Sequence, residues 1–352
     1  MRLLASGLML LVGSGCSWPP FPGNLDGSNG GYNIACGLNW TDPTNGALSI
    51  NNILNSIFVN NDAVYAVGEN GIVLVLHKSS PIPTMCRISN NPSLRSIWIT
   101  VGHAYIAGSN GIYETDPNKI CASPPSPLPG TSTYSCSDIW GIGTVGFAAC
   151  DTDILKTTDA INWISDYKSG KPKGQGASTI AFESNANKAV VGASYGVAFA
   201  NYDTRMSLAT WSQTSGAPNA PTIWDSWIDS DQFVYLLGDR GAIGRASLND
   251  SPLSWVPIML LAMPTTWNLK SMWGISETSR KTLYVAGYDG PDPSKGRVWT
   301  FDPQNLPPPV PPSEDVAANI QGIQGDDRNL FIVGSTGTGS STKGMILCRQ
   351  RK

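Results

Sequence analysis

Histidine and charged residues are scarce in this sequence. Its 352 residues include two histidines, and charged residues make up 14% of the chain, against roughly 25% in an average soluble domain. The formal net charge is −3. Strong attraction to nucleic acid or to anionic lipid is therefore not expected, and we predict no nucleic-acid partner.

Sequence patterns for metal and phosphate chemistry are also missing. No Cys-x-x-Cys pair occurs, so the usual signature of zinc or thioredoxin-like chemistry is absent. Asp225, Asp229 and Asp231 lie close together, as do Asp289 and Asp292, but neither group has the spacing of a calcium loop. We expect these carboxylates to be solvated turn residues. We assign no catalytic residue, no metal ligand and no cofactor, and consider an enzyme the less favoured interpretation.

Long apolar runs are absent beyond the first residues. Met1-Arg2, the apolar residues 3–12 and Gly13-Ser14-Gly15 precede Cys16, and the apolar part is too short to span a bilayer as a mature helix. This start resembles a bacterial lipoprotein signal, in which the cysteine is lipidated after cleavage. The alternatives are an ordinary secretory signal cut after Gly15, which leaves Cys16 unmodified, and an uncleaved anchor. We therefore predict a signal peptide at 1–15, a flexible tether at 16–32 and one folded domain at 33–352.

Glycine, proline and tryptophan are plentiful, with 37, 26 and 12 residues. They accompany a repeated pattern of an apolar strand, a Gly, two or three polar residues, a second Gly and another strand, as in Val64 to Ile72. The spacing between successive marker positions runs from 40 to 49 residues. The markers are Gly68, Gly108, Cys150, Gly192, Gly238, Gly287 and Gly334.

Seven strand-rich units of this length predict a seven-bladed β-propeller with four-stranded blades. We attribute the two glycines to tight turns that require positive φ. Only three strands follow in the last unit, so we expect residues 37–42, around Trp40, to complete the last blade and close the ring.

The seven cysteines fit an oxidising compartment once Cys16 is set aside. Cys36 and Cys348 would join the two ends of the ring. Cys136 and Cys150 are placed symmetrically about one hairpin, and Cys86 and Cys121 are left to pair, both in outer strands of neighbouring blades. The alternative is that some of the six are free buried thiols.

The repeats resemble those of bacterial β-propeller lipoproteins and of Asp-box or photosystem II assembly factor-like propellers. The closest match to the Asp-box pattern is Ile154 to Trp163, which is one residue short and lacks the Gly. The resemblance covers about residues 37–348 and implies the propeller architecture, which by itself does not define an activity.

We therefore expect a lipid-anchored module of the bacterial cell envelope, held at the outer membrane by its lipid, that binds a protein or a glycan. The alternatives are a secreted hydrolase or lyase acting on polysaccharide and, by analogy with the resembled propellers, an assembly factor for a membrane complex.

Overall fold

The computed structural model describes residues 34–351, except for residues 35, 45, 47–49, 61, 81, 101, 124, 152, 169–176, 184–187, 194–197, 202–210, 215–219, 259–264, 277–280, 304–311 and 338–340. The predicted signal peptide and tether, with Cys16, lie outside the described residues. Within them, no helix is long and apolar enough to cross a membrane.

The described strands form seven antiparallel sheets that follow one another along the chain. They are sheet 1, β1 (Leu54–Val59), β2 (Ala63–Gly68), β3 (Ile72–His77) and β4 (Thr84–Arg87); sheet 2, β5 (Leu94–Thr100), β6 (His103–Gly108) and β7 (Gly111–Thr115); sheet 3, β8 (Cys136–Ile142), β9 (Val145–Cys150), β10 (Asp153–Thr157) and β11 (Ile164–Lys168); sheet 4, β12 (Ala177–Glu183), β13 (Lys188–Ala193), β14 (Ala198–Asn201) and β15 (Trp211–Thr214); sheet 5, β16 (Ile223–Ile228), β17 (Phe233–Gly238), β18 (Ile243–Ser247) and β19 (Val256–Pro257); sheet 6, β20 (Trp267–Ser276), β21 (Lys281–Asp289), β22 (Gly296–Phe301) and β23 (Ser313–Val316); and sheet 7, β24 (Asn319–Gly325), β25 (Asn329–Thr336) and β26 (Lys343–Gln350).

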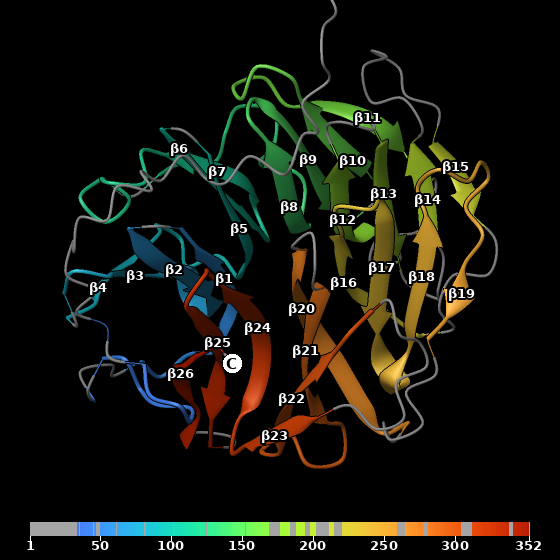
Figure 1. Cartoon of the computed structure of the whole chain (residues 1–352). Helices are drawn as coiled ribbons and strands as arrows, with labels where there is room; N and C mark the ends of the chain where they lie inside the picture. The colour runs from blue at the N-terminus through green and yellow to red at the C-terminus, as the bar shows by residue number, and fades with distance from the viewer. Residues whose placement is uncertain are drawn as a thin grey trace, which may run out of the picture.

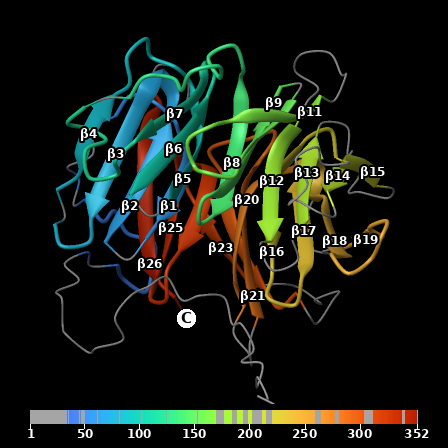
Figure 2. The same cartoon turned by 90° about the horizontal axis from the view of Figure 1, so that it is seen from above.

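The sheets are arranged in a closed ring around a central axis (Figure 1). The first strand of each sheet is innermost, each of these strands contacts the next one, and β24 contacts β1. Figure 2 shows the same ring turned by 90°, with the sheets side by side. The predicted all-β propeller is confirmed, and each sheet corresponds to one repeat of the sequence.

Within the described residues, five of the sheets have four strands, as expected, and two have three. Sheet 2 ends with β7, beyond which the structure has a single bridge between Tyr113 and Pro127. Sheet 7 ends with β26, beyond which Thr41 forms a single bridge to Cys348. Each of these outer positions is therefore filled by a short extended contact, and only the inner three strands pair over their length.

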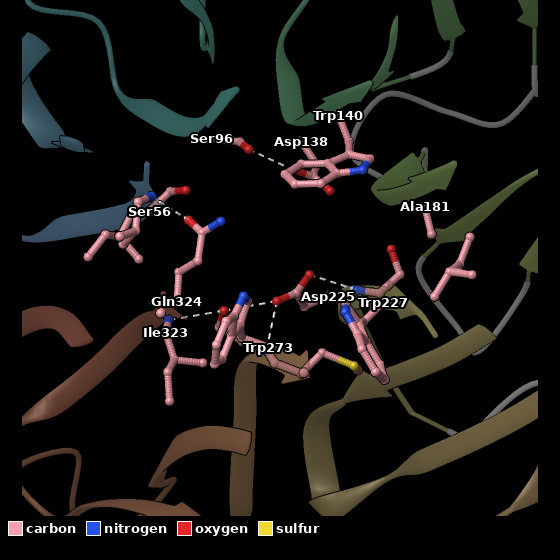
Figure 3. Close-up of a pocket in the computed structure, with 18 of the residues that line it drawn as sticks. Ser56, Ser96, Asp138, Trp140, Ala181, Asp225, Trp227, Trp273, Ile323 and Gln324 are labelled. Carbon is pink, nitrogen blue, oxygen red and sulfur yellow. Dashed lines mark hydrogen bonds between the residues drawn. The ribbon is translucent and has the colours of Figure 1, made fainter. Parts of the chain in front are cut away.

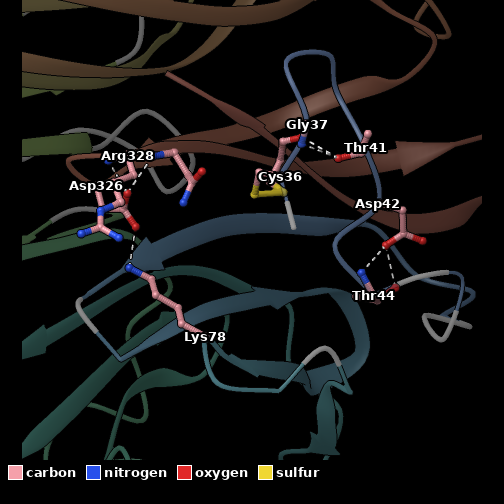
Figure 4. Close-up of a disulfide and its surroundings, with 10 residues drawn as sticks. Cys36, Gly37, Thr41, Asp42, Thr44, Lys78, Asp326 and Arg328 are labelled. Atoms are coloured by element: carbon pink, nitrogen blue, oxygen red, sulfur yellow. Dashed lines mark hydrogen bonds and ion pairs between the residues drawn. A yellow bond between two sulfur atoms is a disulfide. The ribbon is translucent and has the colours of Figure 1, made fainter. Parts of the chain in front are cut away.

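The N-terminal segment lies against β26, as the sequence predicts (Figure 4). Thr41 and Cys348 exchange two backbone hydrogen bonds of 2.8 Å, and Gln350 N donates to Gly37 O at 2.7 Å. A disulfide joins Cys36 to Cys348 across 312 residues of sequence. The ring is thus closed covalently as well as by hydrogen bonds.

The structure contains the other two predicted disulfides, Cys86–Cys121 and Cys136–Cys150. The second joins facing residues of β8 and β9. The location expected for Cys121 is wrong, because this residue lies in a turn after β7 and not in an outer strand.

The reason given for the first marker glycine is also wrong. Gly68 and Gly238 have extended backbones, with φ of −164°. A Cβ at Gly68 would overlap the carbonyl oxygen of Ile53, which accepts a hydrogen bond from Glu69 N. The first glycine therefore makes room for a crossing backbone, and positive φ is required at the second one, as at Gly71 (φ 69°).

Every innermost strand has a bulge near its start. In six of the seven sheets the residue before the bulge pairs with the marker position, for example Leu54 with Gly68, and the next residue is left unpaired. In sheet 4 the register differs by one residue, because Ala177 pairs with Ala193 and the marker Gly192 pairs with Thr179. A bulge redirects the side chains that follow it. Those side chains line the centre of the ring, and they form the site described next.

Candidate functional site

A cavity of about 450 Å³ occupies the centre of the ring (Figure 3). All seven innermost strands contribute to it. Its polar and aromatic lining includes Ser56, Ser96, Asp138, Trp140, Phe182, Asp225, Ser226, Trp227, Ser271, Trp273, Ser276, Gln324, Asp326, Asp327 and Arg351. Its aliphatic lining includes Ile57, Ile97, Ile139, Ile180, Met272 and Ile323.

Asp138 joins the second, third and fourth sheets inside this cavity. Its Oδ1 accepts hydrogen bonds from Ser96 Oγ at 2.7 Å and from Ile139 N at 2.8 Å. Its Oδ2 accepts from Thr179 Oγ1 at 3.0 Å and from Ile180 N at 2.9 Å. A carboxylate offers about four lone-pair positions, so protein donors fill the acceptor capacity of Asp138.

Asp225 plays the corresponding part between the fifth and sixth sheets. It accepts hydrogen bonds from Ser226 N at 2.7 Å, Ser271 Oγ at 2.9 Å and Met272 N at 2.8 Å. Burial, and secondarily the negative charge of Asp138, raises the pKa of Asp225 to about 7. Among the described contacts, neither carboxylate has a Lys or Arg partner. Arg351, the basic residue of the lining, donates to the backbone carbonyl of Asp326 at the rim.

Three half-buried indoles, those of Trp140, Trp227 and Trp273, line the cavity. Each comes two residues after the first residue that follows the bulge in its strand. Trp273 stacks on Tyr284 of the neighbouring strand, with ring centroids 5.9 Å apart and planes at 23°. Its other neighbour is Gly325 of the next sheet, where a Cβ would clash with the indole. The ring is therefore fixed by packing.

A second tryptophan is fixed in the same way. Trp227 packs against Tyr235 at 5.5 Å, and a Cβ at Gly274 would overlap its indole. The adjacent residues Trp273 and Gly274 thus contact both neighbouring sheets: the Trp273 indole packs on Gly325 of sheet 7, and Gly274 leaves room for the Trp227 indole of sheet 5.

The rim of the cavity lies where the innermost strands turn into their second strands. Asp327 is 75% exposed there and lies 3.8 Å from Arg328. Asp326 is buried and pairs with Lys78 of sheet 1 (Figure 4), and Arg351 donates a hydrogen bond to its backbone carbonyl at 3.1 Å. The rim therefore holds one exposed carboxylate, that of Asp327, close to the basic side chains of Arg328 and Arg351.

The aspartates considered above as a calcium site have other partners. Asp225 faces the cavity, whereas Asp229 and Asp231 both form ion pairs with Lys281. Asp292 accepts a hydrogen bond from Ser294 Oγ and forms an ion pair with Lys295. The expectation that they are solvated turn residues is wrong for Asp225, which lies within a strand, and for Asp229, which is buried. Within the described residues, no three His, Cys, Asp or Glu side chains gather around a point that could hold a metal ion.

One nucleophile pattern is present in the sequence. Residues 192–196 spell Gly-x-Ser-x-Gly, which in a nucleophile elbow joins a strand to a helix. Here the pattern connects the end of β13 to β14, another strand. Ser194 itself lies outside the described residues.

The sequence reasoning missed the residues of the cavity. A signal for them exists, because the position after the bulge carries a small or acidic polar residue in six of the seven repeats: Ser56, Ser96, Asp138, Thr179, Asp225 and Ser271. The repeats must first be aligned on their bulges for this column to become visible.

Solved structures of β-propellers are similar to this chain. A structure described as YCF48 bound to D1 peptide matches with a TM-score of 0.61 and 13% identity, over 89% of this chain and 96% of that chain. YCF48 from Cyanidioschyzon merolae matches with a TM-score of 0.58 and 14% identity, over 90% and 99%. The WD40 β-propeller domain of Doa1 matches with a TM-score of 0.63 and 10% identity, over 90% and 98%. At these identities the likeness shows the fold alone. No protein-family model matches the sequence, and no curated protein matches it.

Proposed function

We propose that the chain is a seven-bladed propeller that binds a protein partner at the bacterial cell envelope, where a lipid on Cys16 holds it. The observation that carries the binding role is the cavity at the centre of the ring. It is lined by fixed indoles and by two carboxyl groups that have no Lys or Arg partner among the described contacts, and the exposed Asp327 lies at its rim. Rigid aromatic side chains with part of their surface exposed are typical of binding sites. YCF48, a structural neighbour, is described as bound to a peptide.

A protein partner fits the cavity better than a glycan does. Sugar recognition relies on free carboxylate oxygens that accept hydrogen bonds from hydroxyl groups. Asp138 is saturated by four protein donors and Asp225 receives three, so little acceptor capacity remains for a sugar.

The test is capture from the organism's own envelope. The affinity-tagged full chain is crosslinked in cells, purified in detergent and compared with a reduced and denatured sample of the same chain. One partner recovered in stoichiometric amount with the folded chain supports the proposal. Recovery of the same proteins with both samples contradicts it.

The lipid anchor has its own test. The chain with Cys16 intact should partition into detergent and carry two or three acyl chains by mass, and Cys16→Ser should abolish both properties. An unmodified Cys16 in the mature protein would favour plain secretion.

A polysaccharide hydrolase is the second candidate, because one observation favours it. Asp225, with its pKa raised to about 7, lies in the same cavity as Asp138, and two carboxyl groups with different environments are the usual acid and base of glycoside hydrolysis. Turnover of envelope polysaccharide that is lost in Asp225→Asn would establish this function, and absence of turnover would remove it.

A further inference from the structure

The residues that line the cavity indicate which kind of side chain of a protein partner it would bind. This inference rests on the proposed function. The innermost strands arrange the lining in layers. In β16, Asp225 is followed by Ser226 and Trp227, and in β8, Asp138 is followed by Ile139 and Trp140. From the rim at Asp327 inward, a ligand therefore meets indoles, then aliphatic side chains, and then carboxylates.

The aliphatic layer is suited to a hydrocarbon stem. In five of the seven sheets the second residue after the bulge is an isoleucine that lines the cavity: Ile57, Ile97, Ile139, Ile180 and Ile323. Such a layer gains free energy from burying methylene groups, about 0.8 kcal/mol for each one.

The layer beneath it is suited to a positive charge. Neither Asp138 nor Asp225 has a basic partner among the described contacts. Burial and the charge of Asp138 raise the pKa of Asp225 to about 7, so Asp225 is only partly ionised near neutral pH. A cation between them would relieve the repulsion between the two carboxyl groups. Three donors leave Asp225 one lone-pair position, which can accept one of the three N–H groups of an ammonium. The lining also contains serine hydroxyl oxygens, such as that of Ser56, that can accept the others.

The indole layer adds to the selection for charge. Trp is the side chain whose ring face attracts a cation most strongly, and Trp227 and Trp273 are held in place by the glycines and tyrosines described above. Trp227 and Asp225 are two residues apart along one strand, a distance of about 6–7 Å. This distance is close to the length of an extended lysine side chain.

We infer that the central cavity binds the side chain of a lysine from the protein partner. The stem lies against the isoleucine layer, the ammonium group lies beside Asp225 and Asp138, and the partner's backbone stays at the level of the indoles, near the rim. An arginine is disfavoured, because a planar guanidinium has five donors and the saturated carboxylates offer few acceptors.

The test uses two short peptides that differ in one group. Acetyl-Gly-Lys-Gly-amide is the probe, and acetyl-Gly-norleucine-Gly-amide, which has the aliphatic stem without the ammonium, is its control. Binding to the intact full chain in detergent is measured by calorimetry. We expect the lysine peptide to bind at least roughly fivefold more tightly, since a cation over an indole contributes about 1 kcal/mol or more. Equal binding of the two peptides, or no saturable binding of either, would overturn the inference.

Variants locate the binding in the cavity. Trp273→Phe keeps an aromatic ring of weaker cation attraction and should weaken binding of the lysine peptide by roughly threefold to tenfold, with less effect on the norleucine peptide. Trp163→Phe is the matched control, because Trp163 packs on Tyr105 outside the cavity and its Nε1 has no hydrogen-bond partner among the residues that the structure describes. Equal losses in the two variants would contradict the inference, and circular dichroism of each variant verifies folding.

Failure of this inference is distinguishable from failure of the proposed function. A partner captured by the wild-type chain and equally by Trp273→Phe, and not displaced by the lysine peptide, would overturn the lysine site and leave protein binding intact. Displacement of the partner by the lysine peptide, and not by the norleucine peptide, would support both.

Discussion

Lys281, at the start of β21, places its Nζ 3.0 Å from Oδ2 of Asp229, in the turn between β16 and β17, with both side chains almost fully buried. Asp229 also accepts hydrogen bonds from the backbone of Asp231 and Phe233 at 2.9 Å, and from Tyr235 Oη at 3.2 Å. This network joins the fifth and sixth sheets at the face where their first two strands meet.

The pair predicts a large effect from removing one partner. Lys281→Met should lower the free energy of unfolding by about 3–5 kcal/mol, because it leaves a buried carboxylate without its cation. Urea unfolding followed by tryptophan fluorescence measures this loss. The double variant Lys281→Met/Asp229→Asn should recover part of it, and a double variant less stable than Lys281→Met would contradict the explanation.

The three disulfides should differ in their contributions to stability. The chain-entropy model gives about 5–6 kcal/mol for Cys36–Cys348, about 4 for Cys86–Cys121 and about 3 for Cys136–Cys150, because their sequence separations are 312, 35 and 14 residues. Paired Cys→Ser variants, unfolded without reductant, should follow this order. Intact mass before and after reduction is the prior measurement, and a mass unchanged by reduction would show that the disulfides do not form.

The sequence was sufficient for the architecture because the repeats carry it. Each marker glycine follows an apolar strand at a regular interval, and each repeat became one sheet. The disulfide between residues 136 and 150 could be predicted because both cysteines belong to one hairpin, where pairing follows from symmetry about the turn.

The cavity could not be predicted in the same way. Asp225 resembles any polar residue of a short strand, and its burial depends on the neighbouring sheet, whose Ser271 and Met272 lie 46 and 47 residues further along the chain. The short outer contacts could not be predicted for a similar reason. Whether Thr41 forms a strand or a single bridge depends on how closely the chain follows β26, and the β-propensity of the residues does not specify this.

A substitution at a marker glycine tests whether this glycine is needed because another backbone segment passes close to it. Gly68→Ala should destabilise the fold by about 1–3 kcal/mol, because the added methyl overlaps a backbone carbonyl that cannot move freely. Gly37→Ala is the control: its Cβ would meet nothing closer than 3.4 Å, so we expect a change within about 0.5 kcal/mol. A neutral Gly68→Ala would show that the backbone can separate there.

Asp225 predicts a pH dependence of stability with a definite sign. Its pKa in the folded chain is raised to about 7, above about 3.9 in an unfolded chain, so the folded state holds more protons between these values. The free energy of unfolding of the wild type, relative to Asp225→Asn, should therefore fall as pH rises from about 4 to about 7 and stay constant above that.

Urea unfolding of both proteins at unit steps of pH measures this difference. Taking the difference cancels the opposite contribution of carboxyls whose pKa is lowered, such as Asp292, which is bonded to Ser294 and Lys295. A difference that does not vary with pH, or that rises, would contradict the assignment.

The bond between Cys36 and Cys348 also determines how the molecule responds to mechanical load. A pull on the chain before residue 36 reaches β26 through the sulfur–sulfur bond and does not pass along the ring. The sheets therefore cannot unfold one after another from the N-terminal end, because the disulfide transmits the force directly to the last strand. With the disulfide formed, such a pull does not separate the first sheet from the last. After reduction, the hydrogen bonds of Thr41 and Gly37 to β26 and the packing of β1 against β24 are what resist it.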